Sequence, residues 1–306
     1  MAGAVFAVDR AALMDHDHRR PELAVSLVNP TSSFTSSFTI GVDKAARHAY
    51  WLAALDDLDL AEWLSTFIPT HLYIGSEFCE HLLPTAHTLK KAIDRAQEID
   101  CRVSLLTPIA SSQVIRNLAR LLSRLPDGSE VIVNDWGVGY FVKNHFARLR
   151  PVAGRILCRM MKDPRLGRSS NVFSFDPRPL ATMFRRLGME RMEMDVPIFV
   201  DDSTFASLPM SASVHVPFSC VAKGRMCQIG STAIRGPERF AVGRACKKEC
   251  LKASAELKRP GMSAECRTFQ LGNTIISRHS KEAFEVVKTA VERGFVSRII
   301  APGEAI

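Results

Sequence analysis

Short apolar runs alternate with amphipathic segments from residue 71 towards the end of the chain. The run HLYIG at 71–75 has the apolar character of a buried strand. It is followed at 84–99 by a segment in which Leu89, Ala92 and Ala96 recur at helical spacing. The pattern therefore predicts a strand and then a helix that covers one face of a sheet.

The same unit recurs along the chain. Predicted strands lie at 102–108, 130–135, 151–157, 189–197, 211–219 and 297–302, predicted helices at 111–125, 136–149, 176–188 and 281–294, and a hairpin-like pair of strands at 266–277. Such alternation is typical of right-handed βαβ units in a parallel sheet. Seven or eight steps predict an α/β fold of the (β/α)8 or TIM-like barrel type, incomplete or decorated.

A doubly wound open sheet is the alternative architecture. No glycine-rich G-x-G-x-x-G or P-loop motif follows any predicted strand, which argues against a nucleotide-binding site.

The first seventy residues lack this repeat. Residues 1–39 contain the patch DHDHRR and the run TSSFTSSFT, and we expect a loosely ordered extension there. Residues 43–67 carry apolar side chains at largely helical spacing, with Asp43 as the N-cap of one helix. The sequence thus predicts an extension plus a packing helix over 1–69 and a barrel domain over 70–306.

Composition is that of an ordinary globular protein. Of the 306 residues, 46% are hydrophobic, and the formal net charge is +8. The positive charge suits an anionic partner, although an evenly spread basic surface gives the same total. Charges interrupt the apolar part of the N-terminus, and no continuous apolar run is long enough for a membrane span, so we expect a soluble, cytoplasmic protein.

Polar side chains follow several of the predicted strands. Glu77, Asp135, Arg155 and Asp195 each lie at or just beyond a strand end. In a parallel barrel these ends meet at one face, so we interpret Glu77, Asp135 and Arg155 as candidate catalytic residues for acid-base work or substrate orientation. The alternative is structural: Asp135 caps the following helix and Glu77 pairs with a basic neighbour.

The segment 219–251 holds half of the eight cysteines. Cys220, Cys227, Cys246 and Cys250 follow the spacing C-x6-C-x18-C-x3-C in a glycine- and arginine-rich loop. Clustered thiols in a reducing compartment more often bind metal than form disulfides. The spacing lacks the paired short knuckles of structural zinc sites, and the basic linker would offset the charge of thiolates on iron, so an iron-sulfur cluster is favoured over zinc.

These residues resemble peptidase family U32, the collagenase-like family. The run SCVAKGRMC followed by G-x-A-C-x3-C is similar to the family's cysteine signature. HLYIGSEFCE, RVSLLTPIASSQ, EVIVNDWGVGYFV, LRPVAGRIL and LGNTIISRHS resemble its ubiquinone-biosynthesis accessory branch, the UbiU and UbiV-like proteins. The resemblance covers roughly residues 70 to 302.

The resemblance implies a barrel with a 4Fe-4S cluster on four cysteines. It also implies a role in oxygen-independent hydroxylation of a ubiquinone precursor, as a heterodimer with a related U32-family subunit. Other branches imply an RNA substrate, tRNA or rRNA, and a zinc-stapled binding protein without turnover is a third hypothesis. We expect no working peptidase, because the sequence shows no protease nucleophile motif.

Three ligands of that cluster follow from the resemblance: Cys220, Cys246 and Cys250. For the fourth, Cys227 is favoured because it lies on the same loop, and Cys79, just after the first predicted strand, is the alternate.

Overall fold

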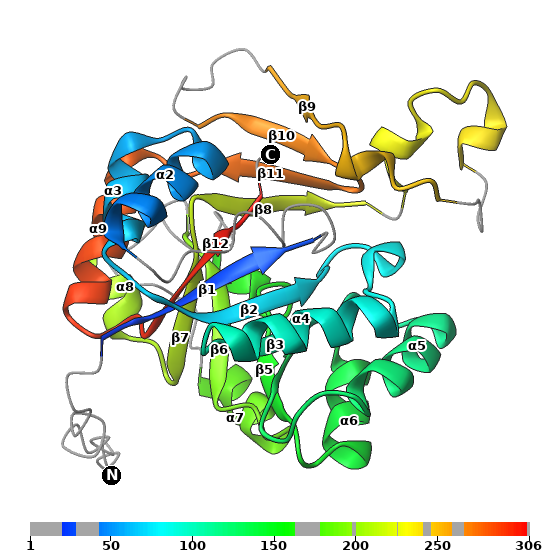
Figure 1. Ribbon diagram of the computed structural model, residues 1–306, viewed down its shortest axis with the longest axis horizontal. Coiled ribbons are helices and arrows are strands. Elements are labelled where there is room, and N and C mark those ends of the chain that lie inside the picture. Colours follow the sequence, from blue (N-terminus) through cyan, green and yellow to red (C-terminus); the bar gives the residue numbers. More distant parts are fainter. Residues whose placement is uncertain are drawn as a thin grey trace, which may run out of the picture.

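The computed structural model describes residues 20–28, 43–162, 178–197, 200–224, 226–240, 246–258 and 266–304 (Figure 1). Eight parallel strands close into a barrel in the order β1, β12, β7, β6, β5, β4, β3, β2. Their bounds are Glu22–Leu27 (β1), Pro69–Gly75 (β2), Arg102–Leu106 (β3), Glu130–Val133 (β4), Arg150–Ala153 (β5), Arg191–Asp195 (β6), Ser211–His215 (β7) and Arg298–Pro302 (β12). The TIM-like barrel expected from the repeat is confirmed, and the open sheet is wrong.

The first barrel strand comes from the segment that the sequence predicted to be an extension. β1 pairs with β12 on one side and with β2 on the other, so that Ala24 lies opposite both Ile300 and His71. The prediction that the barrel begins at residue 70 is therefore wrong for residues 22–27. The rest of the segment 1–39 lies almost entirely outside the described residues.

Helices surround the barrel and connect its strands. They are α2 (Lys44–Leu55), α3 (Leu58–Ser65), α4 (Ala86–Glu98), α5 (Ser112–Leu122), α6 (Trp136–His145), α7 (Arg178–Arg186), α8 (Asp202–Ala206) and α9 (Lys281–Glu292). The single helix expected over 43–67 is instead two, because Asp56 adopts a left-handed conformation with φ 51° and Asp57 caps the second helix. Asp43 caps α2 as predicted, accepting from the Ala46 amide.

Two apolar clusters lie on opposite sides of the barrel wall. Leu23, Val25, Leu72 and Ile74 belong to a large outer cluster between strands and helices. Neighbouring positions point inwards and form a cluster of six, Ala24, Tyr73, Leu106, Ile132, Val152 and Ile300. The barrel interior is thus apolar only in a thin central layer, and buried polar side chains lie at both ends of it.

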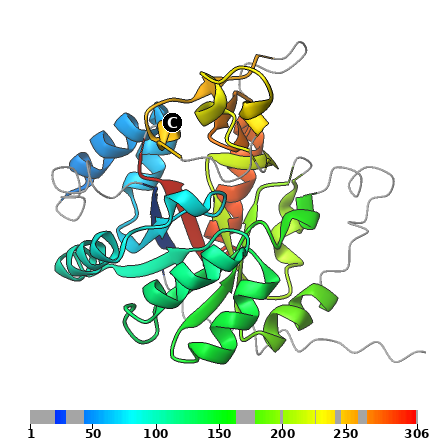
Figure 2. The same cartoon turned by 90° about the vertical axis from the view of Figure 1, so that its right-hand side faces the viewer.

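A four-stranded antiparallel sheet, separate from the barrel, lies over one end of it (Figures 1 and 2). Its strands are β8 (Phe218–Lys223), β9 (Ala255–Glu256), β10 (Thr268–Leu271) and β11 (Thr274–Arg278), in the order β8, β11, β10, β9. The predicted hairpin at 266–277 is confirmed as β10 and β11. The predicted strand at 211–219 divides, because the chain leaves the barrel after β7 and enters the small sheet as β8.

Among the described residues, none of the helices is both long and apolar enough to cross a membrane.

Candidate functional site

Arg155 binds two buried carboxylates at the carboxyl end of the barrel strands. Its Nε and Nη2 donate to Glu77 Oε2 at 2.9 and 2.6 Å, and its Nη1 donates to Asp195 Oδ1 at 3.0 Å. Burial by itself would lower the pKa of the guanidinium, but the two carboxylates raise it above its usual value. The structure thus brings together three of the four polar residues that follow the predicted strands.

A tight turn after β2 directs Glu77 over the barrel. Gly75 has φ +112°, and a Cβ there would lie 2.7 Å from the Leu106 carbonyl oxygen, so glycine is required by both conformation and space. Ser76 then accepts hydrogen bonds at 3.2 Å from the amides of Phe78 and Cys79. The turn therefore fixes Glu77 and Cys79 relative to one another.

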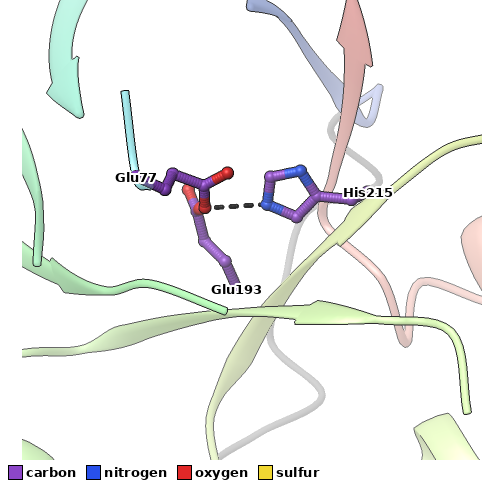
Figure 3. A group of neighbouring side chains, drawn as sticks. All are labelled: Glu77, Glu193 and His215. Carbon is purple, nitrogen blue, oxygen red and sulfur yellow. Dashed lines mark hydrogen bonds and ion pairs between the residues drawn. The ribbon is translucent and has the colours of Figure 1, made fainter. Parts of the chain in front are cut away.

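Glu193 and His215 lie beside Glu77 inside the barrel (Figure 3). His215 Nε2 is 3.2 Å from Glu193 Oε2, and the Tyr73 hydroxyl donates to Glu193 Oε1 at 2.7 Å. Burial raises the pKa of Glu193 to about 7, and the hydrogen bond from Tyr73 opposes this shift. A carboxyl group of this kind exchanges its proton near neutral pH, as a general acid or base requires.

Asp135 has a structural role in the described contacts. Its Oδ1 accepts from the amides of Gly137 and Val138 at 2.8 and 3.2 Å, and Asp135 is the N-cap of α6. This is the helix-capping alternative that the sequence left open.

A cavity lies between the barrel mouth and the small sheet. It is lined by Ile109, Arg155, Ile156, Arg159, Asp195, Cys220 and Lys223. Burial lowers the pKa of Lys223, while the nearby Cys79, Cys220, Asp135 and Glu77 act in the opposite direction. Lys223 therefore lies between the cysteine-bearing segments and the carboxylates at the mouth.

Cys227 and Cys250 meet at the turn of the β10–β11 hairpin. Gly272 has φ +55°, and a Cβ there would lie 3.5 Å from the sulfur of Cys250 and 3.7 Å from that of Cys227. Burial and the neighbouring Cys227, Cys79 and Cys246 together raise the pKa of the Cys250 thiol to about 12. These four cysteines are therefore close enough for their charges to interact.

The same hairpin turn connects Cys79 to this group. Asn273 donates from Nδ2 to the Phe78 carbonyl oxygen at 2.8 Å and to the Gly224 carbonyl oxygen at 3.1 Å. The pKa of the Cys79 thiol is raised by burial, with Cys246 and Cys227 among its charged neighbours. The contacts thus group Cys79, the alternate ligand in our sequence analysis, with Cys227, Cys246 and Cys250.

Cys220 has a different environment. It is buried on β8, its amide donates to Asp195 Oδ2 at 3.2 Å, and its side chain lines the cavity with Arg155. Its charge favours the protonated forms of Arg155 and Lys223. The contacts therefore place Cys220 with the carboxylate site.

Tyr73 and His215 are the residues of this site that the sequence did not indicate. His215 reads as an isolated histidine, and Tyr73 as part of an apolar strand. The available signal is the alternation in RMEMD, where Glu193 and Asp195 alternate with methionines. In a strand covered by helices on its outer side, such alternation indicates a polar barrel interior.

Comparisons with known proteins add the following. No family model matches the sequence, and no curated protein sequence matches it. Among solved structures, a plant class V chitinase mutant from Cycas revoluta is similar at 9% sequence identity and a TM-score of 0.37. The alignment covers 92% of this chain and 94% of the chitinase chain. An uncharacterized B. cereus protein aligns with 94% of this chain, also at 9% identity and TM-score 0.37, and this chain spans 62% of its length. Likeness at this level carries no functional argument.

Proposed function

We propose that this protein holds a 4Fe-4S cluster on Cys79, Cys227, Cys246 and Cys250 and acts in the oxygen-independent hydroxylation of a ubiquinone precursor. A related U32-family subunit is the proposed partner. The observation that supports the cluster is the grouping of these four thiols above the barrel mouth.

The donor set suits such a cluster chemically. Four thiolates this close repel each other unless a cationic centre neutralises them, and cysteine thiolates are the usual ligands of iron-sulfur clusters. Lys223 lies beside Cys79, and Lys247 and Lys248 flank Cys246 in the sequence, so positive charge is available to offset the remaining negative charge. When bound, the cluster would supply one-electron chemistry next to the cavity.

The cavity provides a place for the substrate. Arg155, Arg159 and Lys223 give it positive side chains, and Ile109 and Ile156 give it apolar ones. A phenol or quinone ring with an ionisable oxygen would find both kinds of contact there. In this proposal Arg155 contacts the substrate. Glu77 and Asp195 position its guanidinium group.

Iron content in two matched cysteine variants tests the ligand set. We expect the anaerobically purified protein to be brown, with the broad thiolate-to-iron absorption near ~400 nm. Cys79→Ser should lose most of the iron, whereas Cys220→Ser should keep it. A colourless zinc protein would contradict the cluster, and iron loss in Cys220→Ser with retention in Cys79→Ser would contradict the assignment of ligands.

The substrate needs a separate experiment. Deleting the gene should remove anaerobically formed hydroxylated quinone precursors, and a plasmid copy should restore them. The net charge of +8 also suits RNA, so modified tRNA and rRNA nucleosides are measured in the same cells. Loss of a modified nucleoside with normal quinones would replace the quinone proposal with an RNA-modification function.

A further inference from the structure

We propose that Glu77, Glu193 and His215 form a binding site for one divalent transition-metal ion inside the barrel, separate from the cysteine group. The three side chains come from the turn after β2, from β6 and from β7, and they point towards one another (Figure 3). All three are buried, and one ligand atom from each lies within 4.8 Å of the others.

The spacing of the ligand atoms suits a single ion. With metal bonds of about 2.0 to 2.2 Å, adjacent ligand atoms are about 3.0 to 3.5 Å apart, depending on the geometry. His215 Nε2 and Glu193 Oε2 are already 3.2 Å apart. A carboxylate oxygen of Glu77 lies within 4.8 Å of both, so a small adjustment of this side chain would complete the set of three ligands.

The charge balance also favours a cation. Glu77 and Asp195 share the guanidinium of Arg155, whereas Glu193 is in contact with the Tyr73 hydroxyl and His215. Buried carboxylates are paired with cations or metals, because an unpaired charge is costly away from water. A divalent ion between Glu77 and Glu193 would supply the missing positive charge.

The surrounding hydrogen bonds orient two of the ligands. The Tyr73 hydroxyl donates to Glu193 Oε1, which leaves Oε2 directed at His215, and Arg298 in turn donates to the Tyr73 oxygen at 2.8 Å. Arg155 fixes Glu77, whose two oxygens offer about four lone-pair sites and can serve a guanidinium and a metal together. Such outer partners are typical of metal sites and set ligand orientation.

The cavity at the barrel mouth adjoins the proposed site. Arg155 and Asp195 contact each other beside Glu77, and both line the cavity. One imidazole with two carboxylates suits Mn²⁺, Fe²⁺ or Zn²⁺ rather than a soft ion. The cysteine group has the opposite preference, so the two sites differ in ligand chemistry.

Mn²⁺ is the sharpest probe, because it prefers oxygen and nitrogen ligands over thiolates. The full-length protein is treated with chelator, desalted and titrated with MnCl₂, and free Mn²⁺ is followed by its electron paramagnetic resonance signal. We expect one tightly bound ion in the wild type. Glu193→Gln and His215→Gln should each weaken binding by at least about a hundredfold, and Tyr73→Phe by about ten- to a hundredfold.

Controls separate this site from folding and from the cysteines. His87→Gln, an exposed histidine on α4, should bind Mn²⁺ like the wild type. Cys227→Ser should also bind Mn²⁺ normally even if it loses iron, so the metal site and the proposed cluster succeed or fail independently. Circular dichroism and a Mn²⁺-dependent rise in melting temperature report folding of each variant.

Two results would overturn the proposal. One is a wild-type protein that binds no Mn²⁺, and equally no Zn²⁺ in the Cys227→Ser background, at concentrations up to about a millimolar. The other is unchanged Mn²⁺ affinity in folded Glu193→Gln and His215→Gln variants. Either outcome would mean that a hydrogen bond joins His215 and Glu193 and that they hold no metal ion.

Discussion

The barrel contains two arginine-centred clusters, one at each end, and they differ in what surrounds them. At the amino end, Arg298 donates to Glu22, Glu130 and the Tyr73 hydroxyl, and it lies 3.0 Å from a ring nitrogen of His71. Its side chain is 1% exposed. This one cation neutralises the carboxylates of Glu130 and of the partly exposed Glu22, which Arg191 also contacts at 3.2 Å.

At the carboxyl end, Arg155 also pairs with two carboxylates, Glu77 and Asp195, but its side chain is 11% exposed and lines a cavity. Cys220 and Lys223 line the same cavity. In TIM barrels the amino end generally supports stability and the carboxyl end carries the active site, so we expect the two clusters to serve different purposes. A buried ion pair beside an accessible space is the better candidate for a functional site.

The largest expected effect comes from removing each arginine. Arg298→Met leaves Glu130 without its arginine and Glu22 with Arg191 alone, and it should lower the free energy of unfolding by about 3 to 5 kcal/mol. Arg155→Met leaves Glu77 and Asp195, whose side chains are 5% and 2% exposed, without their cation, so a similar loss of about 3 to 5 kcal/mol is expected. Urea unfolding at pH 7 measures both.

Arg124→Ala, an exposed arginine just after α5, is the control and should change little. Anaerobic quinone profiles of complemented cells give the second readout. Arg155→Met should abolish the proposed activity, whereas Arg298→Met should keep it in the fraction of the protein that folds. Equal losses of that activity in the two methionine variants would remove the distinction between the two ends.

The next effect is a pH dependence with opposite sign at the two ends. Burial and Arg298 lower the pKa of His71 from 6.5 to about 4, so its neutral form stabilises the fold. That stability is present above pH 6.5 and is lost as the pH falls through 4, on the order of 3 kcal/mol. His71→Gln should lack this part of the acid sensitivity in urea unfolding from pH 7 to 4.

Glu193 at the other end should behave in reverse. Its pKa is raised from 4.5 to about 7, so its contribution is fully present below pH 4.5 and is lost as the pH rises through 7. With chelator present, Glu193→Gln should therefore gain stability relative to the wild type between pH 4.5 and 8. A constant difference across that range would contradict the assignment.

The smallest effect concerns Asp135, which the sequence offered as a catalytic candidate. If it only caps α6, Asp135→Ala should cost about 1 kcal/mol of unfolding free energy. Asp135→Asn, which keeps a capping oxygen, should cost less. Both variants should retain iron and anaerobic quinone hydroxylation, and a loss of hydroxylation in the stable asparagine variant would restore the catalytic interpretation.

Much of the barrel could be predicted from the sequence, because each strand after residue 70 is an apolar run next to an amphipathic helix. β1 was missed. Its sequence, ELAVSL, is only six residues long. It is not followed directly by an amphipathic segment, as the strands of the repeat are. Its pairing depends on β2 and on β12, which follows it by more than 260 residues, and such long-range contacts leave no local pattern.

Part of the candidate site could also be predicted from local features of the sequence. Glu77, Arg155 and Asp195 lie near strand ends, a local feature, and they do converge. The grouping of Cys79 with the cysteine loop depends on Asn273, which reaches the Phe78 carbonyl oxygen across 195 residues of sequence. Proximity along the chain favoured Cys227 over Cys79 as the fourth ligand, and Cys220 was included because of the family resemblance.

The hairpin turn at Gly272 and Asn273 also has a consequence for the cooperativity of folding. It brings together cysteines roughly 150 residues apart in the sequence, so a cofactor bound there would close a very long loop. By the chain-entropy model for disulfides, a cross-link over about 100 residues stabilises by on the order of 4 to 5 kcal/mol. A bound cofactor would therefore join the small sheet to the barrel, and the two would unfold as one unit.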